Sequence, residues 1–279
     1  MAKERILVAL QGGEPDDAPL EAACALAPVF EADLRGVFVE PDPAHYMLWT
    51  GPGAAGASVV STAIDAVREE ADKACRDAAT RFSKTIEGGP CDKDGASFRR
   101  ITDSPAEAAQ QARLVRLLVA CPEAAAGRGP LADFVAACLV EEAAPLYVPR
   151  KGATPPKTIC VAWDGSKEAA RAAFAAEPLF DQADKVVILH SDRNLDYHDR
   201  AASAPNRLKN WLSAHGVECE TREVDTSGSL GEAMLEAAGE CDLLVAGAYG
   251  HSRVSQFIFG GVTRTLLGAM DGPSVLMAH

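Results

Sequence analysis

Short apolar runs alternate with amphipathic helical stretches along the chain, and the runs recur in the same order in its two halves. The matching pairs are residues 6–10 and 159–162, 34–40 and 185–191, 117–120 and 243–246, and 145–149 and 273–277. Most of these runs are apolar throughout rather than alternating, which is typical of parallel strands covered by helices on both faces. The pattern therefore predicts a duplicated α/β protein with right-handed crossovers between parallel strands.

A polar, proline-rich stretch separates the two halves. Residues 150–156 have the composition of a linker, which predicts domains at residues 1–150 and 157–279. The halves differ most after their second apolar run, where residues 41–58 form an insertion rich in Gly, Pro and Ala. A long helix is predicted to follow, with an apolar stripe made of Ile64, Val67, Ala71, Ala74, Ala78, Phe82 and Ile86. The sequence does not decide between two roles for the insertion, a plain connection and a flap over a site.

The charge of the chain narrows its possible partners. Its 279 residues include 40 acidic and 27 basic side chains, a formal net charge of −13. Such a surface repels a phosphate backbone and anionic lipid, so neither nucleic acid nor a membrane is expected as a partner. The early apolar run at residues 6–10 is too short for a signal peptide, and no run approaches the ~20 apolar residues of a membrane helix. A cytoplasmic protein is predicted.

The cysteines and histidines give no metal or catalytic pattern. None of the eight cysteines forms a C-x-x-C pair, and most lie in apolar runs. We therefore expect them to be reduced core residues, with no disulfide framework and no zinc site. The six histidines lack metal-ligand spacing, and no residue is assigned a catalytic role. Neither a dinucleotide-binding G-x-G-x-x-G after a strand nor a P-loop occurs.

One glycine-rich loop has the composition of an anion site. Gly247 and Gly250 follow the apolar run at residues 243–246, and Gly260 and Gly261 open the next helical stretch. Glycines let backbone N–H groups approach phosphate oxygens, and the positive end of a helix favours an anion. The same glycines could equally serve only as turns. The loop and the following helix also supply a hydroxyl and three candidate cations: Thr263, His251, Arg253 and Arg264.

A carboxylate is predicted at the same edge of the sheet. Asp164 ends the first apolar run of the second half. Ligands of open α/β sheets bind at the carboxyl ends of the strands, where a carboxylate can meet a ribose or an adenine amine. Capping of the next helix is the alternative use of Asp164, although Ser166 is the predicted N-cap. His190 closes the second run of this half and could line the same pocket.

These motifs resemble those of the universal stress protein family. Its members begin with a strand ending Val-x-x-Asp-Gly-Ser, as at residues 161–166, and its nucleotide-binding members have Gly-x-x-Gly, nine residues, then Gly-Ser/Thr, as from Gly247 to Gly260. The resemblance covers residues 157–279. It implies two tandem doubly wound domains, each an open parallel five-stranded sheet with helices on both faces. It also implies an ATP site, with or without Mg²⁺, formed by Trp163, Asp164, His190, Gly247, Gly250, His251, Arg253, Gly260, Gly261, Val262 and Thr263.

The chain departs from the family pattern in two places. Gly261 stands where the family has a Ser or Thr that contacts phosphate, and Thr263 could replace that hydroxyl. In the first half, Gln11 takes the place of Asp164, and Cys121 and Ala124 take the places of the two loop glycines. Side chains there prevent the same close backbone approach. The first half is therefore predicted to be a structural partner without a phosphate site.

Three functions remain open from the sequence. The leading hypothesis is a universal stress protein that binds ATP in its second domain and acts as a stress-response sensor or regulator, with at most slow hydrolysis. The family resemblance adds a homodimer and an unidentified protein partner. One alternative is an interaction module of the same fold that binds no nucleotide. The other is a small-ligand binder that uses a pocket of the first domain beneath the insertion at residues 41–58.

Overall fold

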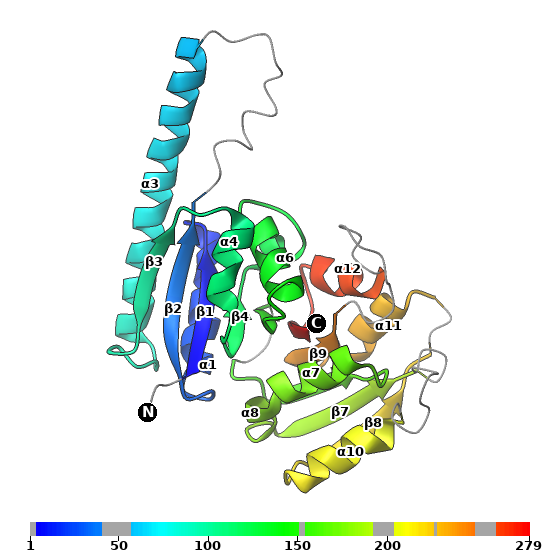
Figure 1. Cartoon of the computed structure of the whole chain (residues 1–279). Coiled ribbons are helices and arrows are strands. Elements are labelled where there is room, and N and C mark those ends of the chain that lie inside the picture. The colour runs from blue at the N-terminus through cyan, green and yellow to red at the C-terminus, as the bar shows by residue number, and fades with distance from the viewer. Residues whose placement is uncertain (1–3, 41–56, 151–153, 192–203, 226–227, 249–260) are drawn as a thin grey trace.

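One continuous sheet runs through the molecule (Figure 1). The computed structural model describes residues 4–40, 57–150, 154–191, 204–225, 228–248 and 261–279, with only the backbone for residues 57–64. Within these ranges the strands are β1 (Glu4–Leu10), β2 (Ala32–Val39), β3 (Ser97–Ile101), β4 (Leu117–Val119), β5 (Leu146–Val148), β6 (Thr158–Ala162), β7 (Lys185–His190), β8 (Cys219–Glu223), β9 (Leu243–Gly247) and β10 (Ser274–Ala278). Their order across the sheet is β3-β2-β1-β4-β5-β10-β9-β6-β7-β8.

The strand order shows the duplication directly. In each half the first strand lies at the centre, the second and third strands extend to one side, and the fourth and fifth to the other. Neighbouring strands are parallel except β5 and β10, which pair antiparallel with Val148 opposite Val275 and Leu146 opposite Met277. The α/β fold class is thereby confirmed. The two predicted five-stranded sheets join edge to edge into one.

Helices cover both faces of the sheet. Their bounds are α1 (Asp17–Leu26), α3 (Ala57–Gly88), α4 (Pro105–Ala109), α5 (Pro122–Ala125), α6 (Ala132–Val140), α7 (Lys167–Ala175), α8 (Glu177–Phe180), α10 (Pro205–Ala214), α11 (Leu230–Ala237) and α12 (Gly261–Gly268), with short 3₁₀ turns at Glu14–Asp16 and Gln110–Ala112. Helices α1, α3, α7, α8 and α10 contribute to one core layer, and α4, α5, α6, α11 and α12 to the other. Each core layer contains residues of both halves, so apolar burial is continuous across the β5–β10 junction.

Helix α3 is the main difference between the halves. It spans 32 residues, whereas its counterpart α10 spans 10. Figure 1 shows it lying along β2 and β3 and continuing well beyond the ends of the strands. The predicted apolar stripe faces the core where the helix overlies the sheet, because Ala78, Phe82 and Ile86 are buried there. Residues 41–56, which hold most of the predicted insertion, lie outside the described residues.

Arg150 fastens the two halves together just after β5. Its guanidinium donates to the carbonyl oxygens of Leu266 (2.6 Å) and Leu267 (3.2 Å) at the last turn of α12, and its backbone N–H donates to Ser274 Oγ (3.0 Å). Burial lowers the pKa of Arg150 to about 10. The Arg150 guanidinium remains a cation at neutral pH, and it interacts favourably with the negative C-terminal end of the α12 dipole. The first residue of the predicted linker is therefore a structural contact.

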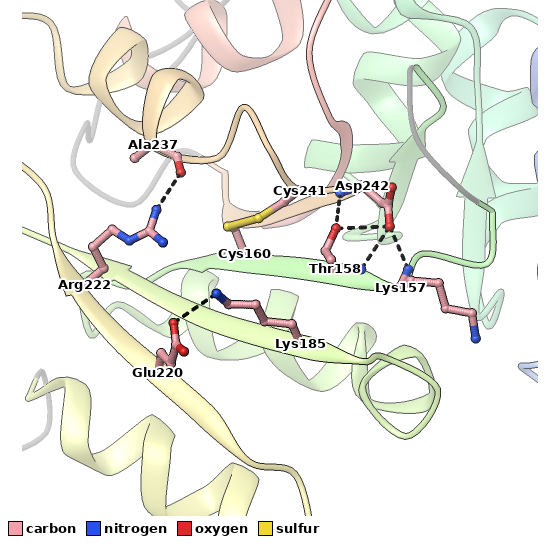
Figure 2. Close-up of a disulfide and its surroundings, with 9 residues drawn as sticks. All are labelled: Lys157, Thr158, Cys160, Lys185, Glu220, Arg222, Ala237, Cys241 and Asp242. Atoms are coloured by element: carbon pink, nitrogen blue, oxygen red, sulfur yellow. Dashed lines mark hydrogen bonds and ion pairs between the residues drawn. A yellow bond between two sulfur atoms is a disulfide. The ribbon is translucent and has the colours of Figure 1, made fainter.

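The expectation that all eight cysteines are reduced is wrong. Cys24 forms a disulfide with Cys91, and Cys160 forms one with Cys241. Figure 2 shows the second bond linking β6 to Cys241, two residues before β9. Next to it, the carboxylate of Asp242 accepts from the backbone N–H groups of Lys157 and Thr158 (both 2.9 Å). Because 67 and 81 residues separate the partners, only the folded chain brings them together.

Thiol counting tests this pairing. Cys75, Cys121, Cys138 and Cys219 are the free cysteines. Protein unfolded in denaturant without reductant is therefore expected to take up four equivalents of iodoacetamide by mass spectrometry, and reduced protein eight. Each disulfide is expected to contribute about 2–4 kcal/mol to the free energy of unfolding, because it restricts the unfolded chain. Eight alkylated thiols without reductant would contradict the pairing.

Candidate functional site

The candidate site lies at the carboxyl edge of the second half. There β6 stands between β7 and β9, and all three run in the same direction. The chain leaves β6 toward β7 and later returns to β9 on its other side, so the strand order reverses between β6 and β9. Such a reversal leaves a crevice outside the strand ends where ligands of open α/β sheets bind. Among the predicted residues, Trp163, Asp164, His190 and Gly247 all come to this edge.

Asp164 shapes the turn between β6 and α7. Its Oδ1 accepts a hydrogen bond from Ser166 N–H (2.9 Å), and Gly165 between them has φ +81°. This left-handed conformation is one that glycine adopts without strain. Ser166 Oγ then accepts from Ala169 N–H (3.1 Å), which confirms Ser166 as the N-cap. One carboxylate oxygen of Asp164 is thus held by the turn.

Trp163 and His190 stand on neighbouring strands at this edge. Trp163 N–H donates to the carbonyl oxygen of Leu189 (2.8 Å), and the carbonyl oxygen of His190 accepts from Val224 N–H (2.7 Å). The Trp163 side chain is buried and that of His190 is half-buried. The backbone bonds therefore fix both residues beside the Asp164 turn.

Gly247 is required by packing at the end of β9. A Cβ at this position would lie 2.6 Å from the backbone nitrogen of Ala169 and 2.9 Å from Cβ of Glu168, both in the first turn of α7. The glycine therefore lets a helix and a strand approach closely. This reason differs from the backbone turn inferred from the sequence.

Glu168 is a feature of this edge that the sequence reading missed. It is 3% exposed, and its Oε1 lies 3.4 Å from Nζ of the neighbouring Lys167, which extends into solvent. The sequence gives no signal for its burial, since carboxylates are seldom fully buried and an acidic residue at the start of a helix is expected in solvent. Its position in the first turn of α7 also suits the helix dipole.

The far end of the predicted loop is the start of α12. Gly261 begins the helix and is exposed, and no atom of the described residues lies within 4 Å of a Cβ built there. Val262 is half-buried, and Thr263 lies on the buried side of α12 with Leu266 and Leu267. Arg264 is exposed. The remaining predicted loop residues, Gly250, His251, Arg253 and Gly260, lie outside the described residues.

The corresponding crevice of the first half is filled by the chain itself. Asp16 is fully buried, and its carboxylate accepts from the N–H groups of Gln11 (3.0 Å) and Gly12 (2.8 Å). Gly13 N–H donates to Asp77 of α3 (2.7 Å). Burial raises the pKa of Asp16. Carboxylates of the protein thus take the amide donors that a bound anion would need.

Helix α3 also closes this crevice sterically. A Cβ on Gly12 would lie 2.7 Å from the carbonyl oxygen of Ala74 in α3. Beside it, the side-chain amide of Gln11 points to Sγ of Cys121 (3.9 Å) after β4. The sequence comparison of the halves noted Gln11 and Cys121 but missed Asp16 and the covering helix.

Comparison with known proteins agrees with this architecture. Residues 156–277 match the universal stress protein family. A universal stress protein of Archaeoglobus fulgidus has a similar structure, with a TM-score of 0.67 at 17% identity over 99% of this chain and 96% of that one. A protein of unknown function from Pseudomonas aeruginosa PAO1 gives 0.56 at 15% identity over 99% and 92%. These two likenesses establish the fold alone.

Among curated proteins, none matches the chain in sequence. In the described part of the chain, no helix has the length and apolar character needed to cross a bilayer.

Replacing Gly247 tests the packing of the universal stress protein domain. Gly247→Ala is expected to lower the free energy of unfolding by about 2 kcal/mol, because the methyl group collides with the first turn of α7. Gly261→Ala is the matched control, since its Cβ meets no atom and alanine favours helix. Urea unfolding of both variants measures the difference. Equal stabilities would contradict the close approach of α7 to β9.

A second glycine pair tests how α3 closes the first half. Gly12 and Gly13 both have positive φ (+86° and +94°), so alanine strains the backbone at each by about 1–3 kcal/mol. Only at Gly12 would the methyl group strike α3, whereas at Gly13 it would lie 3.5 Å from Cδ of Pro15. Gly12→Ala is expected to be the less stable variant by about 2 kcal/mol in urea unfolding. A difference near zero would place α3 elsewhere.

Proposed function

We propose that the universal stress protein domain binds ATP in the crevice at the carboxyl ends of β6 and β9. Binding would change conformation or partner affinity in a stress response rather than drive rapid turnover, because no general base is assigned in the domain. The observation that carries the proposal is the contrast between the halves. The first crevice is filled by Asp16 and α3, whereas in the second no described residue covers the start of α12 beside Gly261.

The described residues fit such a ligand. Asp164 presents a carboxylate at the strand reversal, where it suits a ribose hydroxyl or an adenine amine. Backbone N–H groups at the start of α12 suit phosphate oxygens, since the first turn of a helix has unpaired donors and a positive dipole end. The loop from Gly247 to Thr263 contains no carboxylate, so any Mg²⁺ would be held mainly by phosphate oxygens.

The first half would then act as a structural partner. We propose residues 1–150 and 157–279 as the two domains, with the nucleotide bound by the second. A homodimer, a protein partner and a cytoplasmic location belong to the same proposal. The alternative pocket in the first domain would lie beneath residues 41–58, most of which are outside the described residues, and the filled crevice at Asp16 gives it no support.

One observation favours a second candidate function. Gly261 offers no hydroxyl at the start of α12, and Thr263 lies on the buried side of that helix. A domain that has lost this phosphate contact would act as an interaction module of the same fold without bound nucleotide. Titration with ATP separates the two.

Isothermal titration with Mg²⁺-ATP tests the proposal through three variants. Asp164→Asn keeps an oxygen that can accept from Ser166 N–H but removes the charge, and it is expected to weaken binding about tenfold. Asp181→Asn, at an exposed position after α8, makes the same charge change and is expected to bind as wild type. Gly261→Ser adds a hydroxyl where space is open and is expected to tighten binding several-fold.

The nucleotide-free alternative makes a different prediction for the same measurement. It expects no heat of binding in wild type at millimolar ATP and no nucleotide in native mass spectra of gently purified protein. That result would reject the ATP proposal.

A further inference from the structure

Four arginines of the first half have anionic partners among the described residues. Arg81 of α3 bonds to both Asp17 and Asp77, and Arg100 of β3 bonds to Glu40 and Asp72. Arg113 and Arg116 each pair with a glutamate. This is expected in a protein with 40 acidic and 27 basic side chains, where carboxylates are abundant.

Three other arginines of the same half have no such partner among the described residues, and they lie together. Arg5, Arg35 and Arg99 stand on neighbouring strands β1, β2 and β3. The strand register places Leu7 opposite Arg35 and Val37 opposite Arg99, so each of the other two arginines lies diagonally next to Arg35. Diagonal neighbours on one face are within reach of long side chains. We call these residues the arginine triad.

The triad occupies the sheet face opposite α3. Leu7 and Val37, which share its strand positions, belong to the core layer of α4 and α6. The next residue of β3, Arg100, points to the other face and reaches Asp72 of α3. The two adjacent arginines of β3 therefore differ in their partners. Arg100 pairs with carboxylates on the face that α3 covers, whereas Arg99 is exposed on the opposite face of the sheet.

No described group neutralises the triad. No hydrogen bond or ion pair joins any of the three guanidinium groups to another described residue, and Nε of Arg35 is buried without an acceptor. The pKa of Arg35 is lowered mainly by burial and further by repulsion from the cations Arg5 and Arg99. Asp33 shares this face opposite Arg5, and its carboxylate lies against Gly95. A buried donor without an acceptor is costly, so an external anion would stabilise this arrangement.

We infer that the arginine triad binds a small multivalent oxyanion of the phosphate class. Guanidinium groups match phosphate oxygens with paired N–H donors. Three adjacent strands span about 10 Å, which suits a diphosphate better than a long acidic segment. The ligand could be a free anion or the phosphoryl end of a small metabolite. This site is independent of the proposed ATP site, which lies at the carboxyl edge of the other half.

Pyrophosphate titration at low salt tests the triad. Arg35→Gln and Arg99→Gln are each expected to weaken pyrophosphate binding about tenfold or more, because each removes a charged double donor. Arg76→Gln removes the same charge from an exposed position on α3 and is expected to leave affinity unchanged. Added sodium chloride should weaken binding to wild type through screening.

Stability measured without anion guards against a simple folding defect. Arg35→Gln is expected to unfold at the same or a higher temperature than wild type, since it relieves repulsion, but to lose the stabilisation that pyrophosphate gives. Asp164→Asn is expected to retain triad binding, which separates this site from the ATP site. ADP binding with the same dependence on Arg35 would identify a phosphoryl end as the ligand, and binding of pyrophosphate alone would identify the free anion.

Two outcomes would overturn the inference. One is equal pyrophosphate affinity in Arg35→Gln and Arg76→Gln, which would place any binding elsewhere. The other is no pyrophosphate binding to wild type. Arg35-dependent binding of an oligoglutamate peptide in that second case would show that the face recognises an acidic protein segment instead.

Discussion

The antiparallel pairing of β5 with β10 is the interaction on which the rest of the structure depends. Leu146, Tyr147 and Val148 of β5 are fully buried, as are residues 275–277 of β10. Left unpaired, each would be an apolar strand at the edge of its own half, a surface that proteins seldom leave exposed. Pairing them covers both edges at once and makes the two core layers continuous. The exposed edges that remain are the polar strands β3 and β8.

Joining the halves in this way allows their crevices to diverge. Each half derives part of its stability from the shared sheet, so a change at one carboxyl edge leaves the junction intact. In the first half, Asp16 and Asp77 supply internal acceptors for the backbone N–H groups near Gly12. The buried carboxylate of Asp16 accepts from two backbone N–H groups, so these donors are satisfied without a bound ligand. The second half has an Asp164 turn of its own, but none of its described residues covers the start of α12 beside Gly261.

Much of the fold could be predicted from the sequence because it rests on local periodicity. The apolar runs predicted eight of the ten described strands, their recurrence predicted the duplication, and Ser166 was recognised as a cap from its position before a helix. The polar edge strands β3 and β8 have no apolar run and were not located from the pattern. The disulfides could not be predicted, since Cys160 and Cys241 meet only through strand order. The covering of Gly12 by α3 depends on the path of a long helix over the sheet, and the spacing of residues along the helix does not predict that path.

The candidate site shows how far a glycine motif can be taken as a sign of a ligand. At Gly247 the need for glycine comes from the first turn of α7, and a domain with no ligand would keep it for that reason. At Gly261 no described neighbour restricts a side chain, so packing within the described part of the chain does not account for the glycine. Gly261 is therefore the more informative of the two glycines about a ligand, because contacts with described residues do not explain it. An open helix start beside a turn built on Asp164 argues for a bound anion more strongly than the spacing of the glycines does.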